Sequence, residues 1–342
     1  MLVVDETGDL KKGTHTVGVQ CQYTGTAGRI ENAQVGVYLV YAAAGGHAFL
    51  DRALYLPKSW TTDADRCRDA GVPGDIRFAT KPALAREMIA RALDAGVPAA
   101  WVAGDEVYGA DSKLRSALQE RRIGYVLAVA CDHQITTGAG KHPAKALAQR
   151  LPARAWNRLS AGIGAKGHRW YDWALIDIPV EIAGGQALLV RRSISTGELA
   201  FYRCYTPTPM PLARLVAVAG RRWTIEESFQ AGKGLTGLDE HQVRRWTSWH
   251  RWTVLAMLAH AFLAVMTATA RAETPSPQGL IALTTNEIRH LFSRLVDHTQ
   301  PGIRHLLHWS RWRRRHQARA RECHHAVRRS NSPDHDYRWA GD

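Results

Sequence analysis

The sequence predicts an α/β fold, a mixed sheet with flanking helices, followed by a mostly β segment and a helical C-terminal part. Three observations support this prediction. Short apolar or alternating runs, typical of strands, fill the first 60 residues. Strand and helix patterns then alternate up to residue 130, which favours a layered α/β core. From residue 211 onwards the pattern is helical over most of the chain.

The elements of the predicted core follow one another in order. One strand ends at Asp5, and further strands are expected over residues 15–23, 34–41 and 49–56. A helix over residues 82–95 has a proline in its first turn and is closed by Gly96. A strand that ends at Asp105, a helix near residues 111–121 and a strand over residues 125–130 complete this part.

Changes in composition divide the chain into four parts. We expect the first part of the core at residues 1–130 and a β-rich insertion at residues 131–209, where short alternating runs appear. Residues 210–272 form the helical completion of the core, which carries Glu226. Residues 273–342 form a basic C-terminal helical region, entered through a loop at 274–277, and a polar tail from Ser330.

The chain is strongly basic, with a net charge of +14 and a pI near 9.9. A basic protein of this size usually meets a polyanion, either a nucleic acid or an anionic membrane surface. Between Arg304 and Arg329 there are nine arginines and one acid, Glu322. We expect this segment to contact the DNA backbone; the alternative is a disordered basic tail without a specific role. The candidate contacts are Arg311, Arg313, Arg314 and Arg315.

The five cysteines are scattered and form no C-x-x-C pair, which argues against a disulfide framework and a zinc ribbon. The histidines are also dispersed, and His324-His325 has no partners at metal-ligand spacing. The scattered cysteines favour a reducing cytoplasm as the location, and we see no signal peptide at the N-terminus.

Residues 253–270 are apolar on all sides, and their length is at the lower limit for a membrane span. They are rich in alanine, however, contain His260, and have no second spanning partner. We therefore predict a buried core helix and no membrane partner.

Three acids carry the functional prediction. Asp5 and Asp105 each follow an apolar run, so both are expected at the end of a short buried strand, and Glu226 lies in a stretch with helical spacing. Converging carboxylates repel one another unless a cation neutralises them. Oxygen ligands without a Cys or His cluster favour Mg²⁺ or Mn²⁺ over zinc. Two such ions about 3.5–4 Å apart are a known site for phosphoryl transfer. Acids on two strands and on a late helix are typical of a ribonuclease-H-like arrangement.

The motifs around these acids resemble the DDE transposases of bacterial insertion sequences, most closely the 701-type family. That branch has a Y-x2-R-x3-E-x6-K signature, which Arg222, Glu226 and Lys233 match. The resemblance extends to Val-Asp-Glu-Thr-Gly at 4–8, Lys-Lys-Gly at 11–13, Gly-Asp-Glu-Val-Tyr-Gly at 104–109, and Val-Arg-Arg-Trp at 243–246 with two further tryptophans. It covers residues 3–270.

This resemblance implies that Asp5, Asp105 and Glu226 hold two catalytic Mg²⁺ or Mn²⁺ ions. It also implies that Arg222 and Lys233 contact DNA phosphates, and that residues 131–209 are the β insertion between the second and third acids. Two departures stand out. Ala219 occupies the tyrosine position of the signature, and Asp5 is very near the start of the chain. Because family members carry an N-terminal segment ahead of this strand, we expect a truncated element or a start codon assigned too late.

We therefore predict a transposase that nicks DNA at the ends of an insertion sequence and joins the freed 3′-hydroxyl to target DNA. Because two ends must be brought together, a homodimer on DNA is expected. One alternative is a truncated, non-catalytic DNA-binding remnant. Another is a ribonuclease-H-like nuclease acting on RNA–DNA hybrids, which would not require the long β insertion or the Arg-Trp-x-Ile-Glu helix.

Several nearby residues have simpler interpretations. Glu227 competes with Glu226, but the register after Arg222-Trp223 favours Glu226. We expect Glu6, Glu106 and Asp111 to have surface or helix-capping roles. The three tryptophans Trp246, Trp249 and Trp252 are expected in the core rather than stacked on bases.

Overall fold

The computed structural model describes residues 1–138, 140–164, 167–179, 183–242, 244–273, 277–296 and 302–330. These residues form two compact units. The first unit comprises Met1–Ala161 and Trp170–Val265, and the second comprises Gly162–Arg169 and the chain from Met266. The predicted loop at 274–277 lies mostly outside the described residues, as does Val243.

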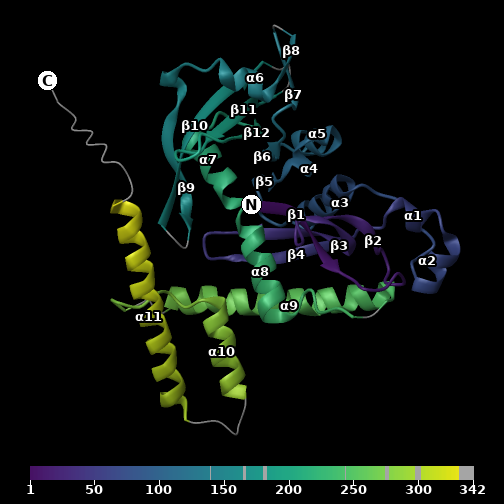
Figure 1. Ribbon diagram of the computed structural model, residues 1–342, viewed down its shortest axis with the longest axis vertical. Helices are drawn as coiled ribbons and strands as arrows, with labels where there is room; N and C mark the ends of the chain where they lie inside the picture. Colours follow the sequence, from purple (N-terminus) through teal and green to yellow (C-terminus); the bar gives the residue numbers. More distant parts are fainter. Residues whose placement is uncertain are drawn as a thin grey trace. The chain divides into compact units, whose positions relative to one another are not determined.

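Within the described residues, ten strands form one mixed sheet (Figure 1). They are β1 (Leu2–Leu10), β2 (Gln20–Thr24), β3 (Arg29–Ala42), β4 (His47–Leu54), β5 (Trp101–Gly104), β6 (Gly124–Val129), β9 (Asn157–Gly164), β10 (Gly167–Ile178), β11 (Gly185–Arg192) and β12 (Leu199–Thr206). Their order is β2-β3-β1-β5-β6-β12-β11-β10-β9, and β4 also pairs with β3. A separate hairpin joins β7 (Gln134–Thr137) and β8 (Gly140–Pro143).

Four strands of residues 131–209, β9 to β12, extend the same sheet, because β12 pairs antiparallel with β6. At the centre, β1 is antiparallel to β3 and parallel to β5, and β5 is parallel to β6. The mixed α/β class predicted from the sequence is therefore confirmed.

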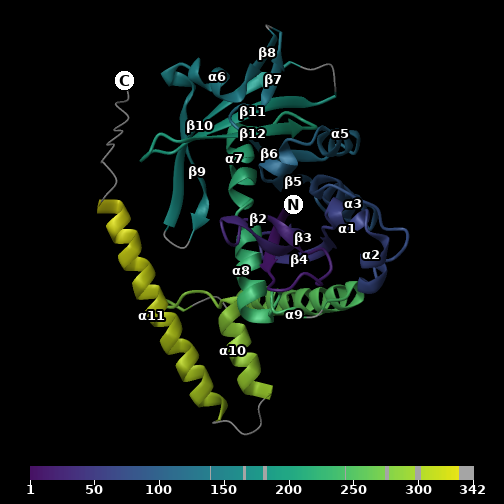
Figure 2. The ribbon, with the colours of Figure 1, turned by 45° about the vertical axis from the view of Figure 1, so that its right-hand side comes forward.

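The helices of the first unit are α1 (Lys58–Thr61), α2 (Ala64–Ala70), α3 (Lys81–Asp94), α4 (Glu106–Gly109), α5 (Ser112–Glu120), α6 (Ala144–Gln149), the 3-10 turn Ala153–Ala155, α7 (Leu212–Arg221), α8 (Thr224–Thr236) and most of α9 (Trp246–Glu273). The second unit contains α10 (Thr285–Val296) and α11 (Ile303–Ser330). In Figures 1 and 2, α7 and α8 follow one another nearly in line.

Alternate residues of β1 pack into different helix layers. Leu2 and Val4 belong to a core with Met88 of α3 and Leu114 of α5. Val3, between them, packs with Ile225 of α8 and with residues of α9. Because successive side chains of a strand point to opposite faces, helices cover both faces of β1. Every residue of β1 up to Val4 is fully buried, which explains its continuous apolar run.

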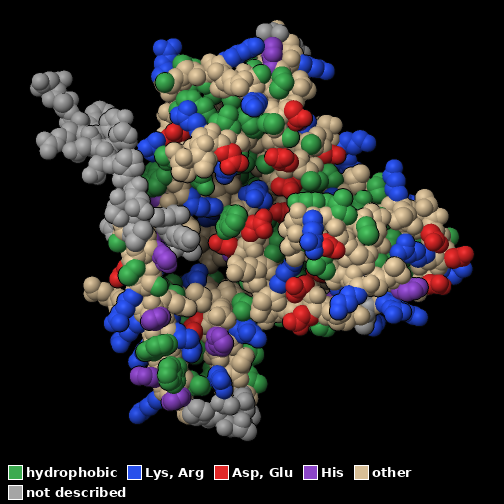
Figure 3. Space-filling view, in the orientation of Figure 1, with side chains coloured by type: hydrophobic (Ala, Val, Ile, Leu, Met, Phe, Trp, Pro, Cys, Tyr) green, Lys and Arg blue, Asp and Glu red, His purple; other side chains and the backbone are tan. Residues whose placement is uncertain are grey.

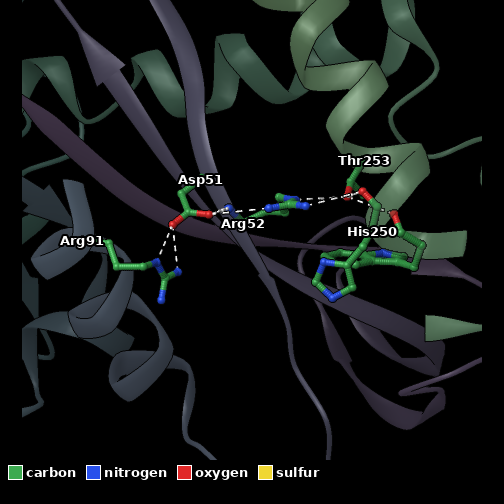
Figure 4. Close-up of polar contacts among 6 residues, drawn as sticks. Asp51, Arg52, Arg91, His250 and Thr253 are labelled. Carbon is green, nitrogen blue, oxygen red and sulfur yellow. Dashed lines mark hydrogen bonds and ion pairs between the residues drawn. The ribbon is translucent and has the colours of Figure 1, made fainter. Parts of the chain in front are cut away.

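A polar network connects these layers through β4 (Figure 4). The guanidinium of Arg91 on α3 donates to Asp51 Oδ2 at 2.8 and 3.2 Å. Next along β4, Arg52 Nε donates to Thr253 Oγ1 of α9 at 3.4 Å, and Arg52 Nη2 donates to the carbonyl oxygen of His250 at 3.5 Å. Neighbouring residues of one strand thus fix a helix on each face of the sheet.

The predicted bounds of four elements agree with the structure to within one or two residues. These elements are β4, α3, α5 and β6. The strand predicted at residues 15–23 is wrong in its first half, since β2 begins at Gln20. Val17 and Val19 are nevertheless buried, against Trp60 and Trp249, so their alternation reflects burial rather than pairing.

The prediction of a fully buried helix at residues 253–270 is also wrong. Ala256, Met257, His260 and Leu263 are buried, but Leu255, Leu258 and Val265 are more than 60% exposed. The helix packs one stripe on the sheet and leaves the opposite stripe uncovered. Among the described residues, α9 is the one helix long and apolar enough to cross a bilayer, and 33% of its most apolar window is buried. A single helix of this kind is weak evidence for a membrane span.

Candidate active site

Asp5 and Asp105 are brought to the same level by the parallel pairing of β1 and β5. Val3 is opposite Ala103, β5 ends at Gly104, and Asp105 follows directly. Asp105 lies at the end of its strand, as predicted. Asp5 does not: it lies in the middle of the nine-residue β1, opposite Tyr38 of β3. The longer strand β3 extends the pairing of β1 beyond the point where β5 stops.

Each of these aspartates uses one oxygen locally. Asp105 is the N-cap of α4, and its Oδ1 accepts from the backbone N–H of Val107 at 2.9 Å. Asp5 Oδ1 accepts from the N–H of Glu6 at 2.8 Å. The turn after Asp105 is compact because Gly109 lies directly against the Ala128 carbonyl of β6, where a larger residue would not fit.

Arg222 connects the third acid, Glu226, to Asp5. Arg222 and Trp223 join α7 to α8 with helical backbone angles. Arg222 Nη1 donates to Asp5 Oδ2 at 3.3 Å, and the same nitrogen is 3.7 Å from Glu226 Oε1, one helical turn further on. Residues from the first strand and from the eighth helix thus meet at one guanidinium. Figure 3 shows acidic side chains gathered where β1, β5 and α8 meet, with basic side chains beside them.

The electrostatics of the site disfavour two charged aspartates. Burial raises the pKa of Asp5 well above its usual value, the negative charge of Asp105 raises it further, and Arg222 opposes both effects. Burial also raises the pKa of Asp105, followed by the repulsion of Glu6. Asp5 is 8% exposed, whereas the Glu226 side chain is 42% exposed. A further cation at this place would relieve the repulsion between the acids.

The donor set fits a hard divalent cation, since it consists of carboxylate oxygens. In the described part of the chain, however, no three His, Cys, Asp or Glu side chains lie close enough together to hold a metal ion as they stand. Arg222 lies between Asp5 and Glu226. The metal ligands Asp5, Asp105 and Glu226 therefore remain a prediction.

The structure separates Glu226 from its neighbour Glu227. Glu227 Oε2 is 3.4 Å from His47 Nε2 of β4, while the other ring nitrogen of His47 is 2.7 Å from Ser228 Oγ. Glu226 instead faces Arg222. This arrangement supports the choice of Glu226 over Glu227.

Lys233, on α8, lies beside Asp9, which is nearer to the C-terminal end of β1 than Asp5 is. Its Nζ is 3.9 Å from Asp9 Oδ1 and 3.5 Å from Thr26 Oγ1, and its side chain is 19% exposed. Lys11 is close by and donates from Nζ to the carbonyl oxygen of His241 at 2.6 Å. Two ion pairs, Arg222–Asp5 and Lys233–Asp9, therefore hold α8 along β1. The phosphate contacts predicted for Arg222 and Lys233 stay predictions.

Glu6 was expected to have a surface or helix-capping role, and this is wrong. Its side chain is 17% exposed, Oε1 accepts from Lys81 Nζ at 2.7 Å, and Oε2 accepts from Tyr108 Oη at 2.6 Å. Tyr108 is fully buried in the turn that follows Asp105. Glu6 thus links the strand of Asp5 to the turn of Asp105. Asp111 caps α5, as predicted, by accepting from the N–H of Leu114.

The tyrosine position of the signature points into the core. Ala219 is 9% exposed and packs in a cluster with Trp101, Trp173 and Leu215. Of the three tryptophans expected in the core, Trp249 is 1% exposed, but Trp252 is 37% exposed and donates its indole N–H to the carbonyl oxygen of Gly237.

The four candidate DNA-binding arginines of α11 have different environments. Arg313 forms two hydrogen bonds to Glu287 of α10, at 2.9 and 2.6 Å, and Arg314 Nε donates to the carbonyl oxygen of Ile281. Arg311 and Arg315 are exposed. The five cysteines, all within the described residues, are free thiols.

Comparison with known proteins bears on the identity of this site. Residues 1–162 match the family model described as "DDE superfamily endonuclease". The chain is also 32% identical, over 137 residues, to the probable transposase for insertion sequence element IS701 from Microchaete diplosiphon. Over these residues the chain is similar to the DDE transposases of the IS701 type. The match covers 40% of this chain and 33% of the Microchaete protein, so the chain spans about a third of the length of that relative.

The family match includes Asp5 and Asp105 but ends before Glu226. A cryo-EM structure of the piggyBac transposase synaptic complex with hairpin DNA has a TM-score of 0.42 and 9% sequence identity, over 97% of this chain and 54% of that one. At that score the likeness carries no weight for the fold or the function of this chain.

Proposed function

We propose that the chain is a transposase that cuts and joins DNA strands in a divalent-metal-dependent reaction during the movement of an insertion sequence. One observation carries the proposal: Asp5 and Glu226, from distant parts of the sequence, meet at Arg222, and Asp105 lies near enough for its charge to raise the pKa of Asp5. The match to the DDE endonuclease family over residues 1–162 and the identity to an IS701 transposase support it.

The order of the central strands supports a ribonuclease-H-like core. An antiparallel meander of β1, β3 and β4 is followed by the parallel strands β5 and β6, with α3 and α5 as the connecting helices. In this proposal β1 and the end of β5 each present one acid, and α8 adds the third from the face that it covers.

Asp5, Asp105 and Glu226 would hold one or two Mg²⁺ or Mn²⁺ ions. When bound, such ions supply an activated water or 3′-hydroxyl and stabilise the leaving oxygen of the phosphodiester. The sheet fixes Asp5 and Asp105 rigidly, while the more exposed Glu226 can adjust from the helix. Rigid placement matters because phosphoryl transfer depends mainly on positioning and on charge stabilisation.

Arg222 would have two partners in this reaction. In the free protein it neutralises Asp5 and Glu226. With Asp5 and Glu226 holding a cation, the guanidinium would be free for a DNA phosphate, to which its fork of donors is suited. DNA at the element ends and at the target is the proposed substrate. A homodimer that holds two ends remains part of the proposal.

A nicking assay tests the proposed function. Supercoiled plasmid that carries the DNA flanking this gene is incubated with the protein and Mn²⁺ or Mg²⁺, or with EDTA. We expect metal-dependent nicking that Asp5→Asn, Asp105→Asn and Glu226→Gln each reduce at least about 100-fold, since loss of even an outer metal partner often costs 10- to 100-fold. Glu227→Gln is the matched control, because it changes the next acid on the same helix, and it should retain most of the activity.

Nicking that persists in EDTA, or in a triple variant of the three acids, would contradict the proposal. Specific DNA binding without nicking by the wild-type chain would favour the alternative of a non-catalytic DNA-binding remnant.

A further inference from the structure

The hairpin of α10 and α11 uses one side of α11 for packing within the second unit. The side chain of Glu287 on α10 is 5% exposed, and its carboxylate accepts two hydrogen bonds from Arg313 of α11. Ser310 and Ala318 of α11 are also buried. A buried carboxylate requires such a partner, so Arg313 has a structural task. Other side chains of α11, among them Trp309 and Trp312, are exposed and available to a binding partner.

A row of aromatic rings runs along α11. Its members are His305, Trp309, Trp312 and His316, and we call them the aromatic row. Their spacing of four, three and four residues places them on one stripe of the helix. The ring centroids of successive members are 6.3, 5.6 and 5.5 Å apart, and the last two rings are parallel within 6°.

This row is exposed although it is aromatic. Trp309 is 44% exposed and Trp312 is 52% exposed. Trp309 is held in place because its indole N–H donates to His305 Nε2 at 3.0 Å. Large indole rings fixed at a surface present flat apolar faces to a partner, which is a common feature of binding sites.

The row continues into a pocket between the two helices. The pocket has a volume of about 480 Å³ and is lined by His290, Leu291, Arg294, His305, Leu306, Trp309 and Arg313. Its wall thus combines an indole ring with two arginines and two histidines. Such a wall suits a flat ring that carries a negative group.

Positive charge borders the aromatic row along its whole length. Arg304, Arg311, Arg315 and Arg319 are all exposed. Figure 3 shows basic, histidine and hydrophobic side chains intermingled over α11. A surface that bound only phosphates would need the arginines but not the indole rings of Trp309 and Trp312.

We propose that the aromatic row and the adjoining pocket bind unpaired nucleotides of single-stranded DNA, with bases stacked on Trp309 and Trp312 and phosphates on the neighbouring arginines. Base faces are available for stacking in single strands, whereas a duplex covers them. The identification of the nucleic acid as DNA rests on the proposed function, in which strand cleavage creates unpaired ends.

The test measures binding of a fluorescently labelled oligothymidylate and of a duplex of the same length to the full-length chain. Fluorescence anisotropy is recorded in EDTA at several salt concentrations, so that cleavage plays no part. The variants are Trp309→Ala/Trp312→Ala, Trp312→Phe and Arg311→Gln/Arg315→Gln. Trp170→Ala serves as the matched control, because Trp170 is also 52% exposed but lies on β10.

We expect the double tryptophan variant to lose single-strand affinity by roughly 5- to 150-fold, the effect of removing one or more stacked bases. Its salt slope and its duplex affinity should stay at the wild-type level, and Trp312→Phe should retain most of the single-strand affinity. The arginine variant should instead lower the salt slope. Circular dichroism should show that every variant keeps the helical content of the wild type.

Equal losses for single strand and duplex, an unchanged single-strand affinity, or the same loss in Trp170→Ala would each overturn the proposal. An unchanged affinity for both forms of DNA would indicate that the aromatic row serves a protein partner. Because no step of this test involves cleavage, a failure of the proposed nicking activity would not affect its result.

Discussion

Arg222 Nη1 lies 3.3 Å from Asp5 Oδ2 and 3.7 Å from Glu226 Oε1, and so joins the first strand to α8 across 217 residues of sequence. Asp5 is almost completely buried, and its charge is unfavourable without a cation nearby. In the free protein, Arg222 is therefore the partner that lets the acids lie together. We expect a divalent metal to perform the same neutralisation as Arg222.

Replacing Arg222 with glutamine should destabilise the metal-free protein by about 1–3 kcal/mol, the usual cost of a lost hydrogen bond to a charged group. Mg²⁺ should then raise the melting temperature of Arg222→Gln by more than it raises that of the wild type. Thermal unfolding with EDTA and with Mg²⁺ measures both effects. Equal Mg²⁺ shifts in the two proteins would show that the ion does not take over the role of Arg222.

Lys233 and Asp9 form the second link between α8 and β1. Burial raises the pKa of Asp9 to about 6, and the positive charge of Lys233 opposes that rise. Lys233→Met should therefore lower the free energy of unfolding by about 1–3 kcal/mol. In an Asp9→Asn background the same change should cost much less, because the partner charge is gone.

Urea unfolding of the four proteins of this cycle measures the coupling between Lys233 and Asp9. A contact of Lys233 with a DNA phosphate would appear separately, as a drop of about one in the salt slope of DNA binding. Additive effects of the two substitutions would refute the link.

The hydrogen bond from Tyr108 to Glu6 fixes the turn of Asp105 against the strand of Asp5. Tyr108→Phe keeps the buried ring but leaves Glu6 Oε2 without its donor, which should cost about 1–3 kcal/mol of unfolding free energy. Tyr41→Phe is the control, since the hydroxyl of Tyr41 donates to the Pro98 carbonyl at an exposed position. Urea unfolding of both variants checks this, and an equal loss in both would contradict the prediction.

Two buried histidines, His241 and His260, and the half-buried His250 should make the protein sensitive to acid. Burial lowers the pKa of His241, His250 and His260 to about 4 each. Because the unfolded value is near 6.5, their neutral forms stabilise the fold above about pH 6.5, and this contribution is lost as the pH falls towards 4. The raised pKa of Asp9 acts in the opposite direction between about pH 4 and 6.

His260→Leu isolates one of these histidines, which is 1% exposed. Between pH 7 and pH 4 the variant should lose up to about 3 kcal/mol less unfolding free energy than the wild type. Urea unfolding at several pH values gives the difference at each pH, in which the other titrating groups cancel. If the free energies of unfolding of the two proteins changed in parallel with pH, His260 would not contribute to the pH dependence.

The local sequence pattern was sufficient to predict an element whose position is determined by its own residues. Asp105 was placed correctly at the end of its strand because the strand is short and the aspartate caps the next helix. The helix near residues 82–95 was found from its proline and its closing glycine for the same reason.

Non-local contacts explain the predictions that failed. Asp5 lies inside its strand because the distant strand β3 pairs along the whole of β1. Glu6 is held by Lys81 and Tyr108, residues 75 and 102 positions away, which no local pattern reveals. The link between Arg222 and Asp5 also depends on how α8 packs on the sheet.

A crystal grown or soaked with Mn²⁺ tests the central claim most directly, because anomalous scattering locates the metal without any assumption about activity. We expect Mn²⁺ bound by the carboxylates of Asp5, Asp105 and Glu226, with Arg222 moved away from Asp5. A crystal that contains Mn²⁺ at other places, while Arg222 still pairs with Asp5 and Glu226, would contradict it.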